Sequence, residues 1–419
     1  MSHSFLIAAP TSGSGKTTIA RGLMALYRRK GYRVQPFKCG PDYIDTKFHA
    51  AVCGRPSINL DTFMATAAHV RELFDRYGRD ADVRIVEGMM GLYDGYDRDH
   101  GSSAEIARVL GIPVVLVVDA RSAAYSMAPL IAGFVHFCPD VRVIGVIFNR
   151  VGSPRHQAML QQVCSDLQVE CLGYLPKRAE LEQGSRYLGL DFSQHPESQL
   201  LVELLEQHVQ WRRLLELTDR ARAEGKRACT HEERSGRTLI ARNDESFSFI
   251  YQEVIDSLRG VEFFDPETDV PNLDGADLLY LPGGYPEKHL DALVANEACR
   301  QAIKAHAERG GRIIAECGGM MYLCQNIVTD DGEYPLCGVL PHSITARRAD
   351  RKLSLGYRRF MLDGKECRGH EFHYTQFVPP VPESMVQVYN AKGEPVPTPI
   401  LRYKNVLASY THLYSMHNA

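Results

Sequence analysis

Short, almost continuous apolar runs alternate with segments of helix length in the first half of the chain. The runs lie at 5–9, 33–37, 83–87, 113–119 and 143–149. A strand that is apolar on both faces must be covered on both faces, and a parallel sheet with helices on each side provides that cover. The segment 17–30, which ends before Gly31, is typical of one such helix. The pattern therefore predicts a doubly wound α/β domain with a parallel sheet.

The pattern changes at about residue 196. Leucine and valine residues then recur at helical spacing up to Val209, and the segment 220–227 that follows is polar. We interpret this stretch as a helix and a solvated connector. The predicted organisation is a first domain at 1–195, a helical linker at 196–235 and a second domain at 236–419.

The second domain is also predicted to be α/β. Strand-like runs return at 238–241, 277–281 and 312–316, with helix-length segments between them. From about Tyr334 the chain has short alternating stretches and proline-rich turns, which indicate added antiparallel strands.

Composition argues against several classes of protein. Among 419 residues, 48 Lys and Arg stand against 51 Asp and Glu, a formal net charge of -3. A nucleic-acid binder or a protein held at an anionic membrane needs a net basic face. Apolar runs such as 112–118 fall well short of the ~20 residues that span a bilayer. The 11 scattered cysteines contain no C-x-x-C pair and are typical of reduced thiols. We expect a cytoplasmic protein with no nucleic-acid or membrane partner.

A glycine-rich loop, APTSGSGKTT at 9–18, joins the first predicted strand to the first predicted helix. Backbone N–H groups and the helix N-terminus converge on phosphate in such a loop. Lys16 is expected to reach the β- and γ-phosphates and Thr17 to bind Mg²⁺, although Pro10 replaces the first glycine of G-x-x-x-x-G-K-[ST]. The loop predicts nucleotide binding. The other nucleotide-binding candidates are Thr11, Gly13, Ser14, Gly15, Thr18 and, for the adenine, Asn149 at the end of a later strand.

Acidic residues follow the second and third predicted strands. Ligands of doubly wound sheets bind beyond the carboxyl ends of the strands, so Asp42, Asp45, Glu87 and Asp94 can converge on one crevice. Mg²⁺ usually takes one or two carboxylates together with waters and phosphate oxygens. We predict Asp42 and Glu87, with Thr17, as metal ligands. Asp45, Asp94 and Tyr43 are candidates for binding a second substrate.

In the second domain, Cys317 lies where a predicted strand turns into a helix, in AECGGMMYL at 315–323. A tight turn presents the thiol outward, and a helix N-terminus is expected to lower the thiol pKa and to supply N–H donors for an oxyanion. His412, near the chain end, is the candidate base. The oxyanion candidates are Gly318 and, from the glycine loop at 281–287, Gly283 and Gly284.

The segment RGHEFHY at 368–374 holds two histidines three residues apart. This spacing differs from the helical H-E-x-x-H of zinc proteases. On a strand, His370 and Phe372 share one face and His373 takes the other. We expect a substrate-facing or structural role here, not a metal site.

With these motifs in this order, the chain resembles the cobyrinic acid a,c-diamide synthase family over nearly its full length. The motifs that carry the resemblance lie at 34–45, 86–95, 281–287, 316–323 and 368–374. That family pairs a dethiobiotin-synthetase-like ATP domain with a class I glutamine amidotransferase domain. The chain departs from the family's usual pattern at His412-Leu-Tyr414, where relatives have His-Leu-His. It also departs at Arg186–Leu190, where many relatives have RHLGL and where tetrapyrrole contacts are expected.

The resemblance implies amidation of the a- and c-acetate groups of cobyrinic acid, with ATP and Mg²⁺ and with glutamine as the nitrogen donor. It places Lys16, Thr17, Asp42 and Glu87 in the ATP site, and Cys317 with His412 in the glutaminase site. Hydrogenobyrinic acid and nickel-sirohydrochlorin stay open as tetrapyrroles, and so does a homodimer. A regulatory P-loop ATPase with a degenerate glutaminase domain is the alternative from another class.

Overall fold

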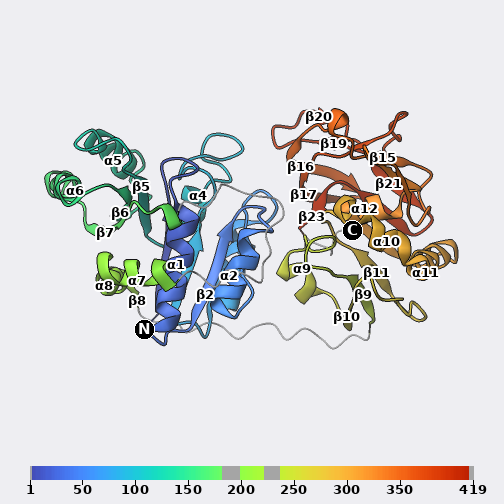
Figure 1. The fold of residues 1–419 in the computed structure, drawn as a ribbon, viewed down its shortest axis with the longest axis horizontal. Helices are drawn as coiled ribbons and strands as arrows, with labels where there is room; N and C mark the ends of the chain where they lie inside the picture. The colour runs from blue at the N-terminus through green and yellow to red at the C-terminus, as the bar shows by residue number, and fades with distance from the viewer. Residues whose placement is uncertain (1, 182–198, 221–235, 415–419) are drawn as a thin grey trace. The chain divides into compact units, whose positions relative to one another are not determined.

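The structure is a computed structural model that describes residues 2–181, 199–220 and 236–414. The chain divides into two compact units, Met1–Cys229 and Thr230–Ala419 (Figure 1). Arg186–Leu190 and most of the polar segment 220–227 lie outside the described residues.

Unit 1 is built on one sheet whose strands follow the order β3-β2-β4-β1-β5-β6-β7, parallel throughout. A further short strand, β8 (Asp219–Arg220), pairs with β1 in the antiparallel direction. The other strands are β1 (Ser2–Ala8), β2 (Val34–Cys39), β3 (Ile58–Leu60), β4 (Val83–Glu87), β5 (Val114–Asp119), β6 (Val143–Val151) and β7 (Cys171–Pro176).

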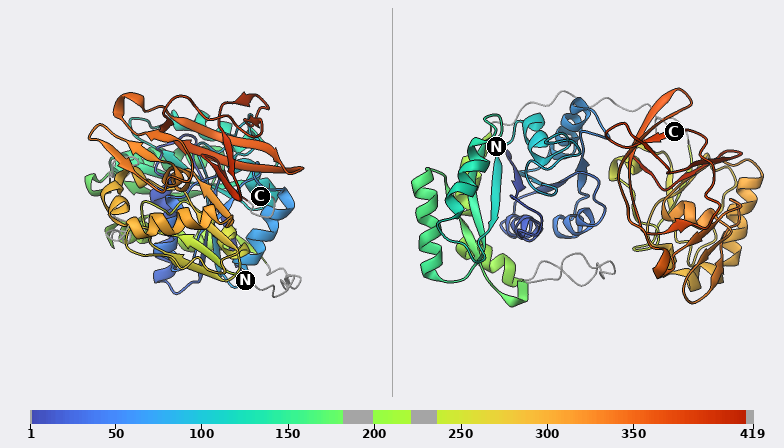
Figure 2. Two further views of the ribbon diagram at one scale, coloured as in Figure 1. Left: turned by 90° about the vertical axis from the view of Figure 1, so that its right-hand side faces the viewer. Right: turned by 90° about the horizontal axis from the view of Figure 1, so that it is seen from above.

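Helices cover both faces of this sheet (Figure 2). On one face, α1, α7 and α8 pack against strand residues such as Phe5, Ile7 and Val117. This confirms the predicted doubly wound arrangement. The helices are α1 (Lys16–Arg29), α2 (Asp45–Cys53), α3 (Ala67–Gly78), α4 (Ser103–Leu110), α5 (Met127–His136), α6 (Pro154–Leu167), α7 (Gln199–His208) and α8 (Trp211–Leu217), with a 3-10 turn at Ala179–Leu181.

The first helix shows how sequence sets these boundaries. Gly15 has φ 91° and lies directly before α1, so the chain turns sharply from the loop into the helix. Ile19, Leu23 and Leu26 recur on one face and are buried against the sheet. Gly31, with φ 87°, follows the helix end in a conformation that glycine adopts without strain.

The helical segment after residue 196 packs into the core of unit 1. Leu205, Trp211 and Leu214 are buried there beside α1, and Tyr27 donates its hydroxyl hydrogen bond to the carbonyl of Trp211 at 3.0 Å. Since β8 also pairs with β1, the described part of the segment predicted as a linker belongs to unit 1. The apolar spacing predicted the helix, but spacing alone does not show what its apolar face covers.

Unit 2 has a main sheet with the order β10-β9-β11-β12-β22-β21. Its strands are parallel up to β22, and β21 is antiparallel. The strands are β9 (Thr238–Ala241), β10 (Val261–Phe264), β11 (Leu278–Leu281), β12 (Ile313–Glu316), β21 (Ile400–Tyr403) and β22 (Val406–Ser409). The helices are α9 (Gln252–Ser257), α10 (Leu290–Ala295), α11 (Glu297–Glu308) and α12 (Gly318–Leu323), with 3-10 turns at Pro286–Lys288 and Arg348–Asp350.

Two smaller sheets from the C-terminal part form a further layer of unit 2, drawn in orange and red in Figure 2. The first has the order β14-β13-β15-β18 and the second β20-β19-β16-β17-β23. Most neighbours in them are antiparallel, as predicted. The strands are β13 (Asn326–Val328), β14 (Glu333–Pro335), β15 (Ser343–Thr345), β16 (Ser354–Leu362), β17 (Lys365–His373), β18 (Gln376–Phe377), β19 (Val388–Tyr389), β20 (Pro395–Val396) and β23 (His412–Leu413).

No helix in the described ranges is long and apolar enough to cross a membrane.

Candidate active sites

The glycine-rich loop of unit 1 connects β1 to α1, as the sequence predicts. Ser14 donates a hydrogen bond from Oγ to the carbonyl of Thr11 at 2.8 Å, which folds the loop back on itself. Gly13 and Gly15 have φ 78° and 91°, so both lie in the left-handed region that favours glycine. Lys16 is the first residue of α1, and the helix N-terminus therefore faces the loop.

Asn149, near the end of β6, holds this loop. Its Nδ2 donates to the carbonyl of Ser14 at 2.9 Å, and a side chain at Gly15 would collide with the same amide group. Arg150 adds a hydrogen bond to the carbonyl of Gly13 at 3.0 Å. Asn149 and Thr18 also line a small pocket with Pro176. The adenine-binding role of Asn149 stays a prediction.

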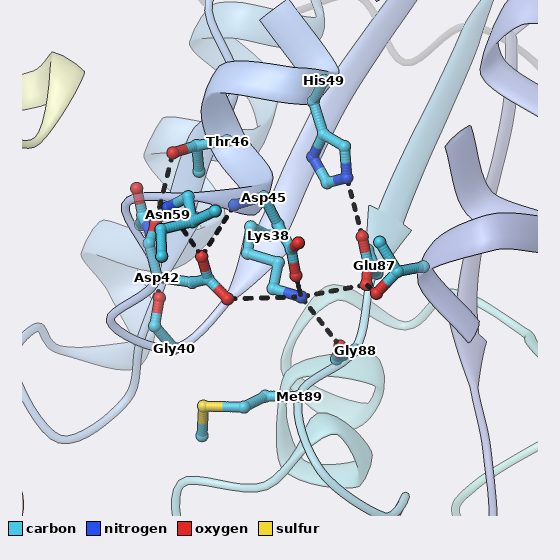
Figure 3. A network of polar contacts seen from close by, with 12 residues as sticks. Lys38, Gly40, Asp42, Asp45, Thr46, His49, Asn59, Glu87, Gly88 and Met89 are labelled. Carbon is cyan, nitrogen blue, oxygen red and sulfur yellow. Dashed lines mark hydrogen bonds and ion pairs between the residues drawn. The ribbon is translucent and has the colours of Figure 1, made fainter. Parts of the chain in front are cut away.

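Lys38, on β2, lies among three carboxylates that come from different parts of unit 1 (Figure 3). Its Nζ is 2.6 Å from Oδ2 of Asp45, 3.0 Å from Oε1 of Glu87 and 3.7 Å from Oδ2 of Asp42. The Lys38 side chain is only 3% exposed and that of Glu87 is fully buried. The structure thus brings three of the four predicted carboxylates together, around a lysine.

Glu87 connects this cluster to the nucleotide loop. Thr17 donates its hydroxyl to Oε1 of Glu87. On the other side, Nε2 of His49 lies 2.7 Å from Oε2 of Glu87, and Nδ1 of His49 lies 3.1 Å from Oγ of Ser57. Both oxygens of the Glu87 carboxylate are therefore held in place by hydrogen-bonding partners.

The charged side chains of this cluster shift one another's pKa values. Burial opposes the charge on Lys38, but the surrounding carboxylates outweigh it and raise the pKa of Lys38. The reverse balance holds for Glu87, where burial is outweighed by Lys38 and the pKa lies well below its usual range. Burial and the neighbouring Asp42 raise the pKa of Asp45 to about 6. Burial and the ammonium of Lys38 lower the pKa of Lys16.

The other predicted residues of this site have local roles in the structure. Oδ1 of Asp42 accepts the backbone N–H groups of Ile44 and Asp45, both at 2.9 Å, at the start of α2. Asp94 accepts the N–H of Gly91 at 2.9 Å in its own loop and is not part of the Lys38 cluster. Tyr43 is half-buried in the loop between β2 and α2.

In the part of the chain that the structure describes, no three His, Cys, Asp or Glu side chains are arranged to hold a metal ion by themselves. Thr17 and Glu87 nevertheless supply hard oxygen atoms in direct contact. Such a partial set fits Mg²⁺, which takes few protein ligands when phosphate oxygens and waters complete its shell.

In unit 2, Cys317 lies at a sharp turn between β12 and α12, as predicted. Its φ of 47° and ψ of -108° are strained values for a residue with a side chain. The Cys317 N–H donates to the carbonyl of Ser409 at 2.7 Å, which anchors the turn to β22. A side chain at Gly318 would meet Gly284, and one at Gly319 would meet the carbonyl of Leu281, so the turn requires glycine after the cysteine.

His412 lies on β23, against the glycine loop at 281–287. A Cβ at Gly283 would lie 2.2 Å from Cε1 of His412, so the ring packs on the bare backbone of that glycine. His412 Nδ1 lies 3.8 Å from Oε2 of Glu316, the residue before Cys317. The predicted oxyanion residues Gly283, Gly284 and Gly318 and the predicted base are therefore gathered around the turn that carries Cys317.

The expected acidity of the Cys317 thiol is not found. Burial and the neighbouring Glu287 raise the pKa of Cys317 above its usual value. The backbone N–H of Gly318, at the start of the six-residue helix α12, lowers this pKa, but by less than burial raises it. Burial also lowers the pKa of His412 to about 3. The resting pair is thus a neutral thiol and a neutral imidazole, and the thiol needs a base at the moment of attack.

Sequence reasoning missed Lys38, His49 and Glu316, and also Tyr280, whose hydroxyl donates to Oε2 of Glu316 at 2.7 Å. Lys38 carried a usable signal, because a lysine in the largely apolar and fully buried strand VQPFKC must find a buried partner. Glu316 carried the same signal at the end of IIAE. His49 and Tyr280 lie within ordinary helical and apolar strand patterns, which gave no such signal.

Comparisons with known proteins agree with this architecture. Residues 5–188 match the family model of the CobQ/CobB/MinD/ParA nucleotide binding domain, and residues 238–419 match that of the CobB/CobQ-like glutamine amidotransferase domain. The chain is 38% identical to a hydrogenobyrinate a,c-diamide synthase of Rhizobium meliloti, covering 98% of this chain and 99% of the relative. It is 36% identical to a cobyrinate a,c-diamide synthase of Caldanaerobacter subterraneus, covering 99% and 95%. The chain therefore belongs to the family of cobyrinate and hydrogenobyrinate a,c-diamide synthases.

Proposed function

We propose that this protein uses ATP and Mg²⁺ to amidate the a- and c-acetate carboxylates of cobyrinic acid with ammonia from glutamine. The observation that supports this most directly is the pairing of two sites in one chain. Unit 1 holds a phosphate loop beside the buried cluster of Lys38, Asp45 and Glu87. Unit 2 holds Cys317 at a strained turn with His412 nearby.

The unit 1 site suits the activation of a carboxylate. A carboxylate is a poor electrophile, and transfer of the γ-phosphoryl group of ATP converts it to an acyl phosphate that ammonia can displace. Negative charge spreads over the phosphoryl oxygens during this transfer. We expect the loop N–H groups and Lys16 to stabilise that charge, and Lys38 supplies a second ammonium, whose charge lowers the pKa of Lys16.

We assign Mg²⁺ to Thr17 and Glu87, with Asp42 as a further carboxylate of the same site. When bound, the ion supplies a Lewis acid for the phosphate oxygens. Thr17 is the second residue of α1, next to Lys16, while Glu87 ends β4 beside Lys38. Thr17 and Glu87 would hold the ion, and their direct contact supports this assignment. Asp45, Tyr43 and Asp94 stay our candidates for contacts with the tetrapyrrole.

The unit 2 site suits hydrolysis of glutamine. The Cys317 sulfur forms a bond to the amide carbon while its proton passes to His412, and the oxyanion is held by N–H groups of the Gly283–Gly284 loop and Gly318. Collapse of this adduct breaks the C–N bond, and ammonia leaves with the proton from His412. Water then hydrolyses the glutamyl thioester.

The acceptor is tested with a panel of purified tetrapyrroles. Cobyrinic acid, hydrogenobyrinic acid and nickel-sirohydrochlorin are each incubated with the protein, ATP, Mg²⁺ and glutamine, and the products are weighed by mass spectrometry. We expect the diamide of cobyrinic acid. A diamide formed only from one of the other two acids would show that our acceptor is wrong and that the proposed reaction is right. If no acid gives an amide, the proposed reaction is wrong. Lys16→Ala serves as the matched inactive control.

We also propose a homodimer, supported by aromatic side chains near α5 that the described chain leaves in solvent. Phe137 is 73% exposed and Tyr125 is 56% exposed. Sedimentation velocity tests this, with Phe137→Ser as the variant. A monomer at all concentrations would reject the proposal.

A further inference from the structure

We propose that Glu316, the residue directly before the nucleophile, is the positioning residue of the glutaminase site: it holds His412 in the tautomer that can accept the thiol proton. The inference rests on the proposed glutamine hydrolysis by Cys317. It concerns a group that the mechanism above does not use.

The Glu316 carboxylate, at the end of β12, connects this strand to β23, which carries His412. Its Oε1 accepts the backbone N–H of Leu413 at 3.0 Å, which ties β23 to the end of β12. Its Oε2 accepts the hydroxyl of Tyr280 at 2.7 Å and lies 3.8 Å from Nδ1 of His412. Since Tyr280 and Leu413 fix both oxygens, a small rotation of the imidazole would complete a hydrogen bond from Nδ1 to Oε2.

An imidazole base needs such a partner. A neutral histidine carries one proton on either ring nitrogen, and only the form protonated at Nδ1 leaves Nε2 free to take a proton from a thiol. In triads of this kind an acidic side chain accepts the Nδ1 proton and also stabilises the imidazolium. The position two residues after His412 is Tyr414, which packs on the ring of Tyr251 and carries no carboxylate.

The other buried carboxylate near His412 is engaged elsewhere. Oε2 of Glu371 accepts from Nε of Arg358 and from Oγ1 of Thr398, and its Oε1 lies 2.7 Å from Nε2 of His373. Glu371 thus belongs to a network with Arg358, Thr398 and His373, and the histidine that its carboxylate contacts is His373. Glu316 is the carboxylate with an oxygen directed at the Nδ1 side of His412.

The charged groups around His412 come from two elements. His370 and His373 of β17 lower the pKa of His412, and Glu371 of the same strand raises it, while burial has the largest effect. From β12, burial raises the pKa of Glu316 to about 8. Below that pH a protonated Glu316 would donate to Nδ1 and favour the wrong tautomer. Above it the carboxylate accepts from Nδ1, so the glutaminase rate should rise with pH through this range.

Glu316→Gln tests the proposal in the full-length protein. The amide keeps the shape and can still accept the N–H of Leu413, but its NH₂ group would donate to Nδ1 and hold the imidazole in the wrong tautomer. We expect the glutaminase kcat to fall by about 10²- to 10⁴-fold, with KM for glutamine almost unchanged. The inflection near pH 8 should disappear, and amidation with ammonium should persist. Glu366→Gln, an exposed change on β17, is the matched control.

The outcomes separate the inference from the function on which it rests. An unchanged kcat and pH profile in Glu316→Gln, with Cys317→Ala inactive toward glutamine, would overturn the positioning role alone. Glutamine hydrolysis that survives in Cys317→Ala would overturn the proposed function itself. If Glu316→Gln does not fold, Tyr280→Phe decides, because it removes only the hydroxyl that orients Oε2. A fall in kcat without a change in KM supports the proposal, and wild-type kinetics there reject it.

Discussion

The ammonium of Lys38 lies 3.0 Å from the carboxylate of Glu87, and both side chains are buried. An ion pair of this kind is stable only as a pair, since each partner compensates a charge that burial would otherwise oppose. The pair joins β2 to β4 at the carboxyl ends of the parallel strands, where the nucleotide loop leaves β1. It therefore links the stability of unit 1 to the geometry of its proposed phosphate site.

Lys38→Met should destabilise unit 1 by about 3–5 kcal/mol, because it leaves the buried Glu87 carboxylate without its cation. Thermal unfolding measures the loss. Amidation should fall with glutamine and with ammonium alike, while glutamine hydrolysis in unit 2 continues. Lys30→Met, which removes a partly exposed ion pair with Glu206, is the control and should change stability by less than about 1 kcal/mol. Equal effects of the two changes would contradict this account.

Glu87→Gln and Asp42→Asn should raise the Mg²⁺ concentration at half-maximal amidation, by about tenfold, because each removes a hard anionic oxygen. A Mg²⁺ titration at saturating ATP checks this. Glu87→Gln should be the more severe change, since Glu87 contacts Thr17 directly whereas Oδ1 of Asp42 is engaged by its own loop. If neither variant changes the half-saturation or the maximal rate, these carboxylates are not at the metal.

Cys317→Ala should eliminate glutamine hydrolysis, since alanine offers no nucleophile, and high ammonium should restore amidation. His412→Ala should show the same pattern less completely. Product formation is measured with glutamine and, separately, with ammonium chloride. Cys324→Ala is the control: Cys324 is buried after α12, with its thiol near the carbonyl of Met320, and it should behave like the wild type. Loss of the ammonium reaction in folded Cys317→Ala would argue against two separate chemical sites.

The stability of unit 2 should fall at alkaline pH because of Glu316. Burial raises its pKa from 4.5 to about 8 in the folded chain. Protonation thus stabilises the folded state fully below about pH 4.5, and this contribution is lost as pH rises toward 8, with a limit of about 5 kcal/mol. The melting temperature of Glu316→Gln relative to the wild type should therefore increase between pH 6 and pH 9. A difference that does not vary with pH would show that Glu316 does not titrate between pH 6 and pH 9 in the folded chain.

The sequence by itself determined the local features of this protein. A glycine-rich loop between a strand and a helix predicted the site of Lys16 and Thr17, and the glycines after Cys317 predicted the sharp turn that the structure contains. Alternating apolar runs predicted two α/β units. These features depend on residues close together in the chain, where spacing and backbone freedom alone decide the outcome.

Only the tertiary structure decided which charges meet and what burial does to them. Lys38 and Glu87 are far apart in the sequence and meet because β2 and β4 are neighbouring parallel strands. Tyr280 and Glu316 likewise lie on the neighbouring parallel strands β11 and β12, while His412 reaches Glu316 from β23 of a separate sheet. Burial likewise reversed the expected effect on the Cys317 thiol, whose pKa is raised where the helix start predicted a lower value. A local pattern names the chemical groups, but their ionisation depends on the solvent and charges around them, which come from distant parts of the chain.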